Sequence, residues 1–146
     1  MTVFNHTGQV VTDLDRSTAF YEALGFTVWY EISPPDDLTA KLNGLTPPLG
    51  TTARYLTLGD FVLELLHYSA PGVTTAHRAR TMADPGLTHL SIAVDDVAVT
   101  ARQVGELGGE VIVDSDLGVA VFVRDPDGQL LELLPAGYRD HLPPRP

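Results

Sequence analysis

The sequence predicts an α+β fold made of two tandem copies of one module, each a strand, a helix and then further strands. The first observation is a pattern that occurs twice, a His in one short apolar run and a Glu in a later one: His6 with Glu64, and His89 with Glu132. The second is a spacing of 83 residues that recurs at three pairs of positions: His6 and His89, Asp13 and Asp96, and Gly25 and Gly108. Self-similarity at a fixed spacing indicates a duplicated structural unit.

The first module is expected to contain one helix between strands. We expect this helix over 14–24, because Asp13 or Asp15 can cap its start and Gly25 stands where a helix typically stops. The other apolar runs are predicted as strands, the last two joined by a turn at Gly59-Asp60: 3–11, 27–32, 54–58 and 61–67.

The second module repeats this order. A helix is predicted over 97–107, and a strong turn signal, Asp125-Pro126-Asp127-Gly128, precedes the last strand. The expected strands cover 87–94, 110–113, 119–124 and 129–134. Glu132 follows Glu64 by only 68 residues, so the first module carries 15 more residues, which fit the Pro- and Gly-rich stretch 33–50.

A chain of 146 residues has the length of one compact domain that holds both modules. We place the modules at 1–68 and 87–135, joined by a linker over 69–86. The Pro-rich tail after Pro135 is expected to add little to the core.

The composition is that of a globular protein without disulfides. Hydrophobic residues make up 44% of the chain and charged residues 19%, and Cys is absent, which excludes thiolate metal sites and a Cys nucleophile. The net charge of −10, with no cluster of Lys or Arg, argues against a nucleic-acid partner. No apolar run approaches the roughly 20 residues of a membrane span, and the first residues lack a signal-peptide pattern. We therefore expect a cytoplasmic protein with no membrane partner.

The two glutamates point to a bound cation. A carboxylate in an otherwise apolar strand is costly to bury unless it is paired or bound to a cation. Each Glu is matched by a His at the same relative place in its module, and the chain has no Cys. The pattern therefore predicts one metal ion held between two similar halves by imidazole and carboxylate ligands: His6, Glu64, His89 and Glu132.

Other polar and aromatic residues are weaker candidates for the site. Gln9 alternates away from His6 and lines a pocket only if its strand bulges. The remaining histidines are expected outside the ligand set: His67, His77 and His141. Three arginines are the candidate anchors for an anionic substrate: Arg54, Arg80 and Arg124. Several aromatic residues are expected in the core, among them Tyr30, Tyr55 and Phe122.

The combination of motifs resembles the vicinal oxygen chelate superfamily, which includes glyoxalase I, methylmalonyl-CoA epimerase, extradiol dioxygenases and the bleomycin and fosfomycin resistance proteins. The resemblance spans nearly the whole chain and rests on four places: 6–26, the Leu-rich run around Glu64, 88–96, and the turn 124–128 followed by Glu132. It implies paired βαβββ modules that form a half-barrel around a divalent metal. It also implies that the four His and Glu residues are the ligands, as in the metal-dependent isomerase branches.

The intact ligand set favours the isomerase and lyase branch, because ring-cleaving dioxygenases typically use two His and one Glu and drug-binding members lose the ligands. Two imidazoles and two carboxylates suit Zn, Ni, Co, Mn or Fe(II), and affinity alone does not choose among them. A metal bound to a carbonyl stabilises the enolate that forms when the adjacent C–H loses its proton. We therefore expect a divalent-metal-dependent epimerase or isomerase that transfers a proton next to a metal-chelated carbonyl of a small metabolite, with Glu64 and Glu132 as proton carriers.

Three alternatives stay open. One is a glyoxalase I-type lyase, although Val10 and Tyr68 stand where its close relatives carry an Arg and an Asn. A ferrous dioxygenase would need iron and consume oxygen, and a non-catalytic drug- or metabolite-binding resistance protein would bind without turnover. Modules of this superfamily pair within a chain or swap across a dimer, and we expect a homodimer that acts on a small carbonyl compound.

Overall fold

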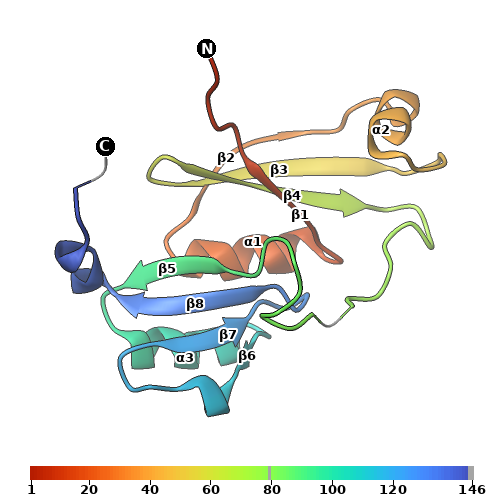
Figure 1. The fold of residues 1–146 in the computed structure, drawn as a ribbon. Coiled ribbons are helices and arrows are strands. Elements are labelled where there is room, and N and C mark those ends of the chain that lie inside the picture. Colours follow the sequence, from red (N-terminus) through yellow and green to blue (C-terminus); the bar gives the residue numbers. More distant parts are fainter. Residues whose placement is uncertain (79, 145–146) are drawn as a thin grey trace. The chain divides into compact units, whose positions relative to one another are not determined.

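The computed structural model describes residues 1–78 and 80–144. The chain divides into two compact units, Met1–Ala76 and His77–Pro146, and each is described by itself (Figure 1). Ala79 in the expected linker and residues 145–146 at the end of the expected tail lie outside the described residues. Within the described residues, no helix has both the length and the apolar character needed to cross a membrane.

Unit 1 (Met1–Ala76) is a four-stranded mixed sheet with two helices. Its elements are β1 (Thr7–Val10), α1 (Leu14–Ala23), β2 (Thr27–Ile32), α2 (Asp36–Asn43), β3 (Thr51–Leu58) and β4 (Phe61–Tyr68). The strand order is β1-β4-β3-β2, with β1 parallel to β4 and the other neighbours antiparallel. The first strand therefore lies beside the last, which brings the start of the unit next to the strand that carries Glu64.

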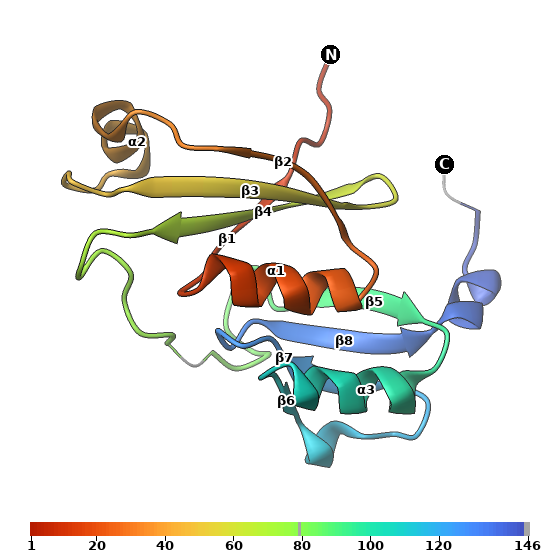
Figure 2. The same ribbon diagram turned by 180° about the vertical axis from the view of Figure 1, so that it is seen from behind.

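Unit 2 (His77–Pro146) has the same topology. Its elements are β5 (Leu90–Val94), α3 (Val97–Glu106), β6 (Glu110–Val111), the 3₁₀ turn η1 (Val113–Ser115), β7 (Val121–Arg124), β8 (Leu130–Pro135) and the 3₁₀ turn η2 (Ala136–His141). The strand order is β5-β8-β7-β6, again with the first strand parallel to the last. Figure 2 shows α3 lying against its own sheet, where it contacts β6, β7 and β8. The shared topology confirms the predicted α+β fold of two βαβββ modules.

The main helix of each unit has an Asp N-cap at its start and a glycine with positive φ after its end. The Asp13 carboxylate accepts a hydrogen bond of 3.0 Å from the backbone N–H of Arg16, and the Asp96 carboxylate accepts one of 2.9 Å from that of Val99. Each contact satisfies a helical N–H that has no partner within the helix. After the helices, Gly25 and Gly108 adopt φ values of 93° and 83°, which only glycine adopts without strain.

The core of each sheet determines which face carries the glutamates. Leu63 and Leu65 in β4 are fully buried, and so are Leu131 and Leu133 in β8. Because successive side chains of a strand point to opposite faces, the Glu between each pair of leucines lies on the face away from the core. Burial of the leucines therefore fixes the face on which each carboxylate stands.

Helix α2 was not expected within the stretch 33–50. It starts after Pro35 with two acidic residues in its first turn and ends at Gly44, which has a φ of 67°. The Asp36 carboxylate accepts hydrogen bonds from the backbone N–H groups of Leu49 and Gly50, at 2.9 and 3.0 Å. These bonds hold the end of the insertion against its beginning, and the Leu49 side chain is fully buried.

The first strand of each unit is shorter than predicted. β1 begins at Thr7 instead of residue 3, and β5 begins at Leu90 instead of residue 87. Val3 and Phe4 are 68% and 70% exposed, so the segment before β1 has no buried face to hold it in the sheet. As a result His6 and His89 each stand one residue before a strand. The tail after Pro135 forms η2, which buries no residue.

Candidate metal centre

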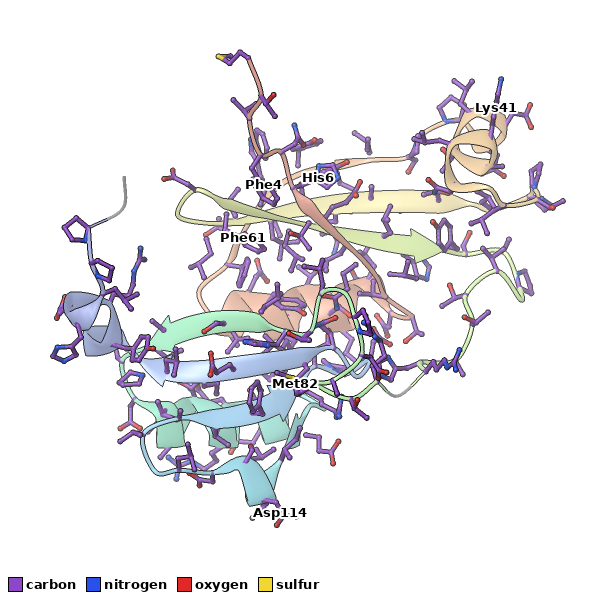
Figure 3. All side chains as sticks on the ribbon, in the orientation of Figure 1. Phe4, His6, Lys41, Phe61, Met82 and Asp114 are labelled. Carbon is purple, nitrogen blue, oxygen red and sulfur yellow. The ribbon has the colours of Figure 1, made fainter. Side chains whose placement is uncertain are left out.

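In unit 1, His6 lies beside Glu64. The Nε2 atom of His6 is 3.1 Å from Oε2 of Glu64. Figure 3 shows His6 where the N-terminal segment enters β1. Parallel pairing of β1 with β4 places Gly8 opposite Glu64, and a Cβ atom at Gly8 would lie only 3.1 Å from the same carboxylate oxygen. The missing side chain of Gly8 therefore leaves the room that the Glu64 carboxylate occupies.

Tyr55 forms a hydrogen bond with the other carboxylate oxygen of Glu64. It stands opposite Glu64 in the β3–β4 pair and donates a hydrogen bond from its hydroxyl to Oε1. The Tyr55 ring stacks on Tyr30 with centroids 4.3 Å apart and planes 8° apart, and it meets the His6 ring edge-on at 5.6 Å. Burial, reinforced by the hydrogen bond and the charge of Glu64, raises the pKa of Tyr55 well above its usual value. The phenol therefore stays protonated and remains a donor.

In unit 2, His89 and Glu132 form the corresponding pair. The Nε2 atom of His89 is 3.7 Å from Oε2 of Glu132. Ser91 stands opposite Glu132 in the parallel β5–β8 pair and donates a hydrogen bond of 2.7 Å to the same oxygen. The His89 ring meets Phe122 edge-on at 5.3 Å, and Phe122 stands opposite Glu132 in the β7–β8 pair.

The two pairs share their layout and differ in their hydroxyl donor. In both units the His precedes the first strand, the Glu stands on the last, and an aromatic residue opposite the Glu packs against the His. Unit 1 places its hydroxyl on this aromatic residue, Tyr55, and has Gly8 on the first strand. Unit 2 has Phe122 at the aromatic position and its hydroxyl on Ser91 of the first strand.

The donor atoms of each pair fit one metal ion. Two ligand atoms that lie about 2.1 Å from an ion and at right angles are about 3.0 Å apart, and at opposite positions about 4.2 Å apart. The separations of 3.1 and 3.7 Å lie within this interval. The side chains of the pairs are 12% to 33% exposed, so they are neither sealed in the core nor fully solvated.

Each unit by itself offers two ligands. Across residues 1–78 and 80–144, no three His, Cys, Asp or Glu side chains are grouped closely enough to hold a metal ion. The structure therefore brings His6 to Glu64 and His89 to Glu132, and the joint action of all four on one ion stays a prediction. Without a metal, each contact is an ion pair when its His is protonated.

A family model matches residues 3–133, which is most of the chain. The chain belongs to the glyoxalase/bleomycin resistance protein/dioxygenase superfamily. No curated protein matches the sequence.

Solved structures of this superfamily are similar to the chain. The trypanothione-dependent glyoxalase I of Leishmania major is 29% identical, with a TM-score of 0.67, and the match covers 92% of this chain and 87% of that one. A glyoxalase family protein from Bacillus cereus is 17% identical with a TM-score of 0.74, covering 91% and 93%. The fosfomycin resistance protein FosX of Listeria monocytogenes, in complex with Mn(II) and sulfate, is 16% identical with a TM-score of 0.62, covering 92% and 93%.

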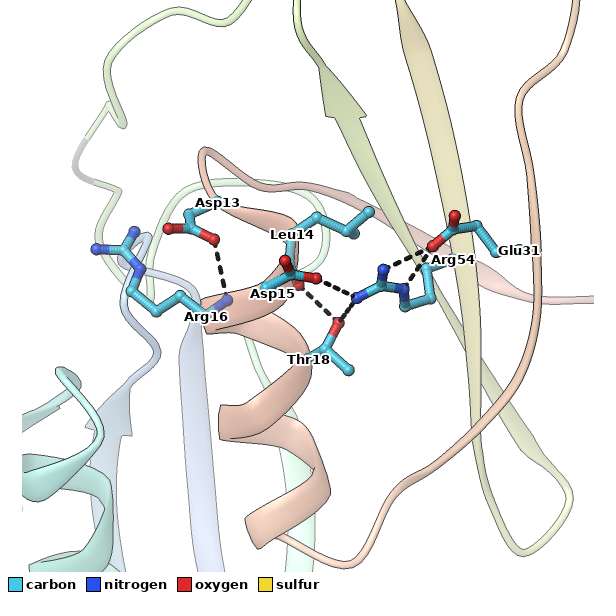
Figure 4. Close-up of polar contacts among 7 residues, drawn as sticks. All are labelled: Asp13, Leu14, Asp15, Arg16, Thr18, Glu31 and Arg54. Atoms are coloured by element: carbon cyan, nitrogen blue, oxygen red, sulfur yellow. Dashed lines mark hydrogen bonds and ion pairs between the residues drawn. The ribbon is translucent and has the colours of Figure 1, made fainter.

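Arg54 is engaged in unit 1 rather than presented to a ligand. Its guanidinium donates to Asp15 at 2.9 Å and Thr18 at 2.8 Å on α1, and to Glu31 at 2.7 Å on β2 (Figure 4). Three partners on two elements make Arg54 a tie between α1 and the sheet. The expectation that it anchors an anionic substrate therefore finds no support in its contacts.

The other two arginines also donate to the protein itself. Arg124 donates to the backbone carbonyl of Gly128 at 3.0 Å and stands 3.8 Å from the Glu110 carboxylate. Arg80 donates to three backbone carbonyls of the segment that leads into β5, at residues 84, 85 and 87. Gln9 accepts a hydrogen bond of 2.9 Å from the buried hydroxyl of Tyr21 in α1, so it faces the helix and not Glu64.

Sequence reasoning missed Tyr55 and Ser91 as neighbours of the glutamates. The signal for Tyr55 was the two-residue turn Gly59-Asp60, which pairs Leu58 with Phe61 and, three residues further along each strand, Tyr55 with Glu64. The signal for Ser91 was its place 83 residues after Gly8, on the strand that must lie beside the Glu strand.

Proposed function

We propose that this protein is a divalent-metal-dependent enzyme that moves a proton next to a metal-chelated carbonyl of a small metabolite, as an epimerase or isomerase. The observation that carries the proposal is the repeated His–Glu pair, with donor atoms 3.1 Å apart in one unit and 3.7 Å apart in the other. Membership of a superfamily with metal-dependent enzymes supports it, and so does the Mn(II) in the structure of FosX.

Four residues would hold the metal: His6, Glu64, His89 and Glu132. This ligand set suits Zn, Ni, Co, Mn or Fe(II). When bound, the metal would polarise the carbonyl and so make the neighbouring C–H acidic enough for a carboxylate to deprotonate. The protein's own task is then to place a base beside that C–H and to return the proton.

The glutamates are the bases in this proposal. Glu64 accepts from Tyr55 on Oε1 and faces His6 with Oε2, so it would act as a base only when Oε2 leaves the metal. Glu132 has its two polar contacts, with Ser91 and His89, on Oε2. Among the described residues Oε1 of Glu132 has no hydrogen-bond partner, and this oxygen is open to accept a proton from a substrate.

Hydrogen–deuterium exchange tests the proposal before the natural substrate is known. The purified protein is analysed for metal and then incubated in D₂O with α-hydroxy carbonyl compounds and acyl thioesters. We expect deuterium uptake at the carbon next to the carbonyl, dependent on metal. Glu64→Gln and Glu132→Gln, which keep an amide oxygen at the ligand position, are loaded with excess metal, and each should slow the exchange by about 10²- to 10⁴-fold for a lost general base. Full exchange in both metal-loaded variants would overturn the role of the glutamates.

A glyoxalase I-type lyase is the second candidate, favoured by the 29% identity to the Leishmania major enzyme. Against it stands Val10 at the position where close relatives of glyoxalase I carry an Arg. Tyr68 replaces an Asn at a second position, and its hydroxyl accepts a hydrogen bond of 3.0 Å from Asn43 in α2. Isomerisation of the methylglyoxal adducts of glutathione and of trypanothione distinguishes the candidates, because only the lyase turns either adduct over.

A further inference from the structure

Glu64 is contacted on both of its oxygens by groups of unit 1. The Tyr55 hydroxyl donates to Oε1, and His6 faces Oε2 at 3.1 Å. Tyr55 itself is only 8% exposed, and its ring is stacked on Tyr30 with centroids 4.3 Å apart. The antiparallel register of β3 and β4 places Tyr55 directly opposite Glu64. The phenol is thus a rigid donor and not a mobile surface group.

We propose that Tyr55 is a positioning residue that keeps Oε1 of Glu64 occupied and so presents Oε2 alone, beside His6, as the metal ligand. This inference rests on the proposed function. A free carboxylate binds a metal through one oxygen or both, and it rotates about its last torsion. A hydroxyl bonded to one oxygen removes that oxygen from competition and fixes the plane of the group.

Unit 2 provides the internal comparison. Phe122 stands opposite Glu132, so no hydroxyl is available on that strand. Ser91 donates instead to Oε2 of Glu132, the oxygen nearer His89. The duplicated units therefore hold their carboxylates in different ways, and the Tyr55 hydroxyl is the feature that sets unit 1 apart.

Tyr55→Phe tests the inference because it removes the hydroxyl and keeps the stacked ring. Tyr138→Phe is the matched control, since Tyr138 lies in η2, is 46% exposed, and among the described residues has no hydrogen bond or ring contact with either His–Glu pair. The full-length, metal-free proteins are titrated with Co(II), followed by calorimetry and by visible absorption. Circular dichroism checks that all three proteins are folded.

We expect Tyr55→Phe to bind Co(II) about 10- to 100-fold more weakly than wild type, as for the loss of a residue that orients a metal ligand. Its visible spectrum should change because a second carboxylate oxygen becomes available, whereas Tyr138→Phe should match wild type in both readouts. Unchanged affinity and spectrum in Tyr55→Phe would overturn the inference and leave the proposed function standing. Absence of Co(II) binding by wild type itself would overturn both.

Discussion

Single atoms decide the shape of each His–Glu pair. In unit 1 the first strand carries Gly8 opposite Glu64, and in unit 2 it carries Ser91 opposite Glu132. The serine hydroxyl bonds its carboxylate, whereas at Gly8 even a Cβ atom would come within 3.1 Å of one. One added methyl group at Gly8 would therefore be enough to displace the Glu64 carboxylate, which we propose as a metal ligand.

Gly8→Ala should weaken metal binding. Its φ does not lie in the left-handed region, so alanine fits the backbone and the effect comes from the Cβ alone. The carboxylate of Glu64 must move by a few tenths of an ångström, away from the position beside His6. We expect about a tenfold loss of affinity for a divalent metal, the low end of the range for disturbed support of a ligand. Calorimetric titration with metal checks this, and wild-type affinity in a folded Gly8→Ala protein would contradict it.

At the scale of elements, the helix caps and the turn at Gly59-Asp60 are the most predictable features. Asp13 and Gly25 bound α1, and Asp96 and Gly108 bound α3, as their residue types predict. Local chemistry decides these places, because the capping side chain and the positive φ act within a few residues.

Elements that depend on partners distant in the sequence were harder to predict. Helix α2 is held by the Asp36 carboxylate, which accepts hydrogen bonds from backbone N–H groups 13 and 14 residues later, a contact that periodicity does not reveal. The start of β1 depends on burial that Val3 and Phe4 lack. The repeat predicts the two His–Glu pairs as ligand types. Tyr55 is buried, as an aromatic side chain predicts, but its hydrogen bond to Glu64 follows from the strand register and not from its residue type.

Gly105 in α3 offers a stabilising substitution. It lies in the last turn of α3, one residue before the end of the helix; its φ is not positive, and an added Cβ would meet nothing within 4 Å. Alanine there restricts the unfolded chain and improves helix propensity, so Gly105→Ala should raise the free energy of unfolding by about 0.5–1 kcal/mol. Urea denaturation followed by circular dichroism measures the change. A loss of stability would contradict this prediction.

For the molecule as a whole, duplication raises the question of how many ions it binds. Each unit supplies one imidazole and one carboxylate, and two ligands alone hold a divalent ion weakly against water. Four ligands on one ion give a strong site, so the proposed function requires one metal per chain and the participation of both units.

Metal-dependent stability makes this requirement testable. Binding to the folded state alone stabilises it by about 2.7 kcal/mol when free metal exceeds its Kd by 100-fold. We therefore expect Mn(II) to raise the Tm of wild type, and metal analysis to find one ion per chain. His6→Ala and His89→Ala remove one ligand from different units, and each should abolish most of the Tm increase. If both units are needed, the double variant should lose no more than either single one. Two ions per chain would instead show that the two pairs bind metal independently. The same conclusion would follow if each single variant kept about half of the wild-type Tm increase.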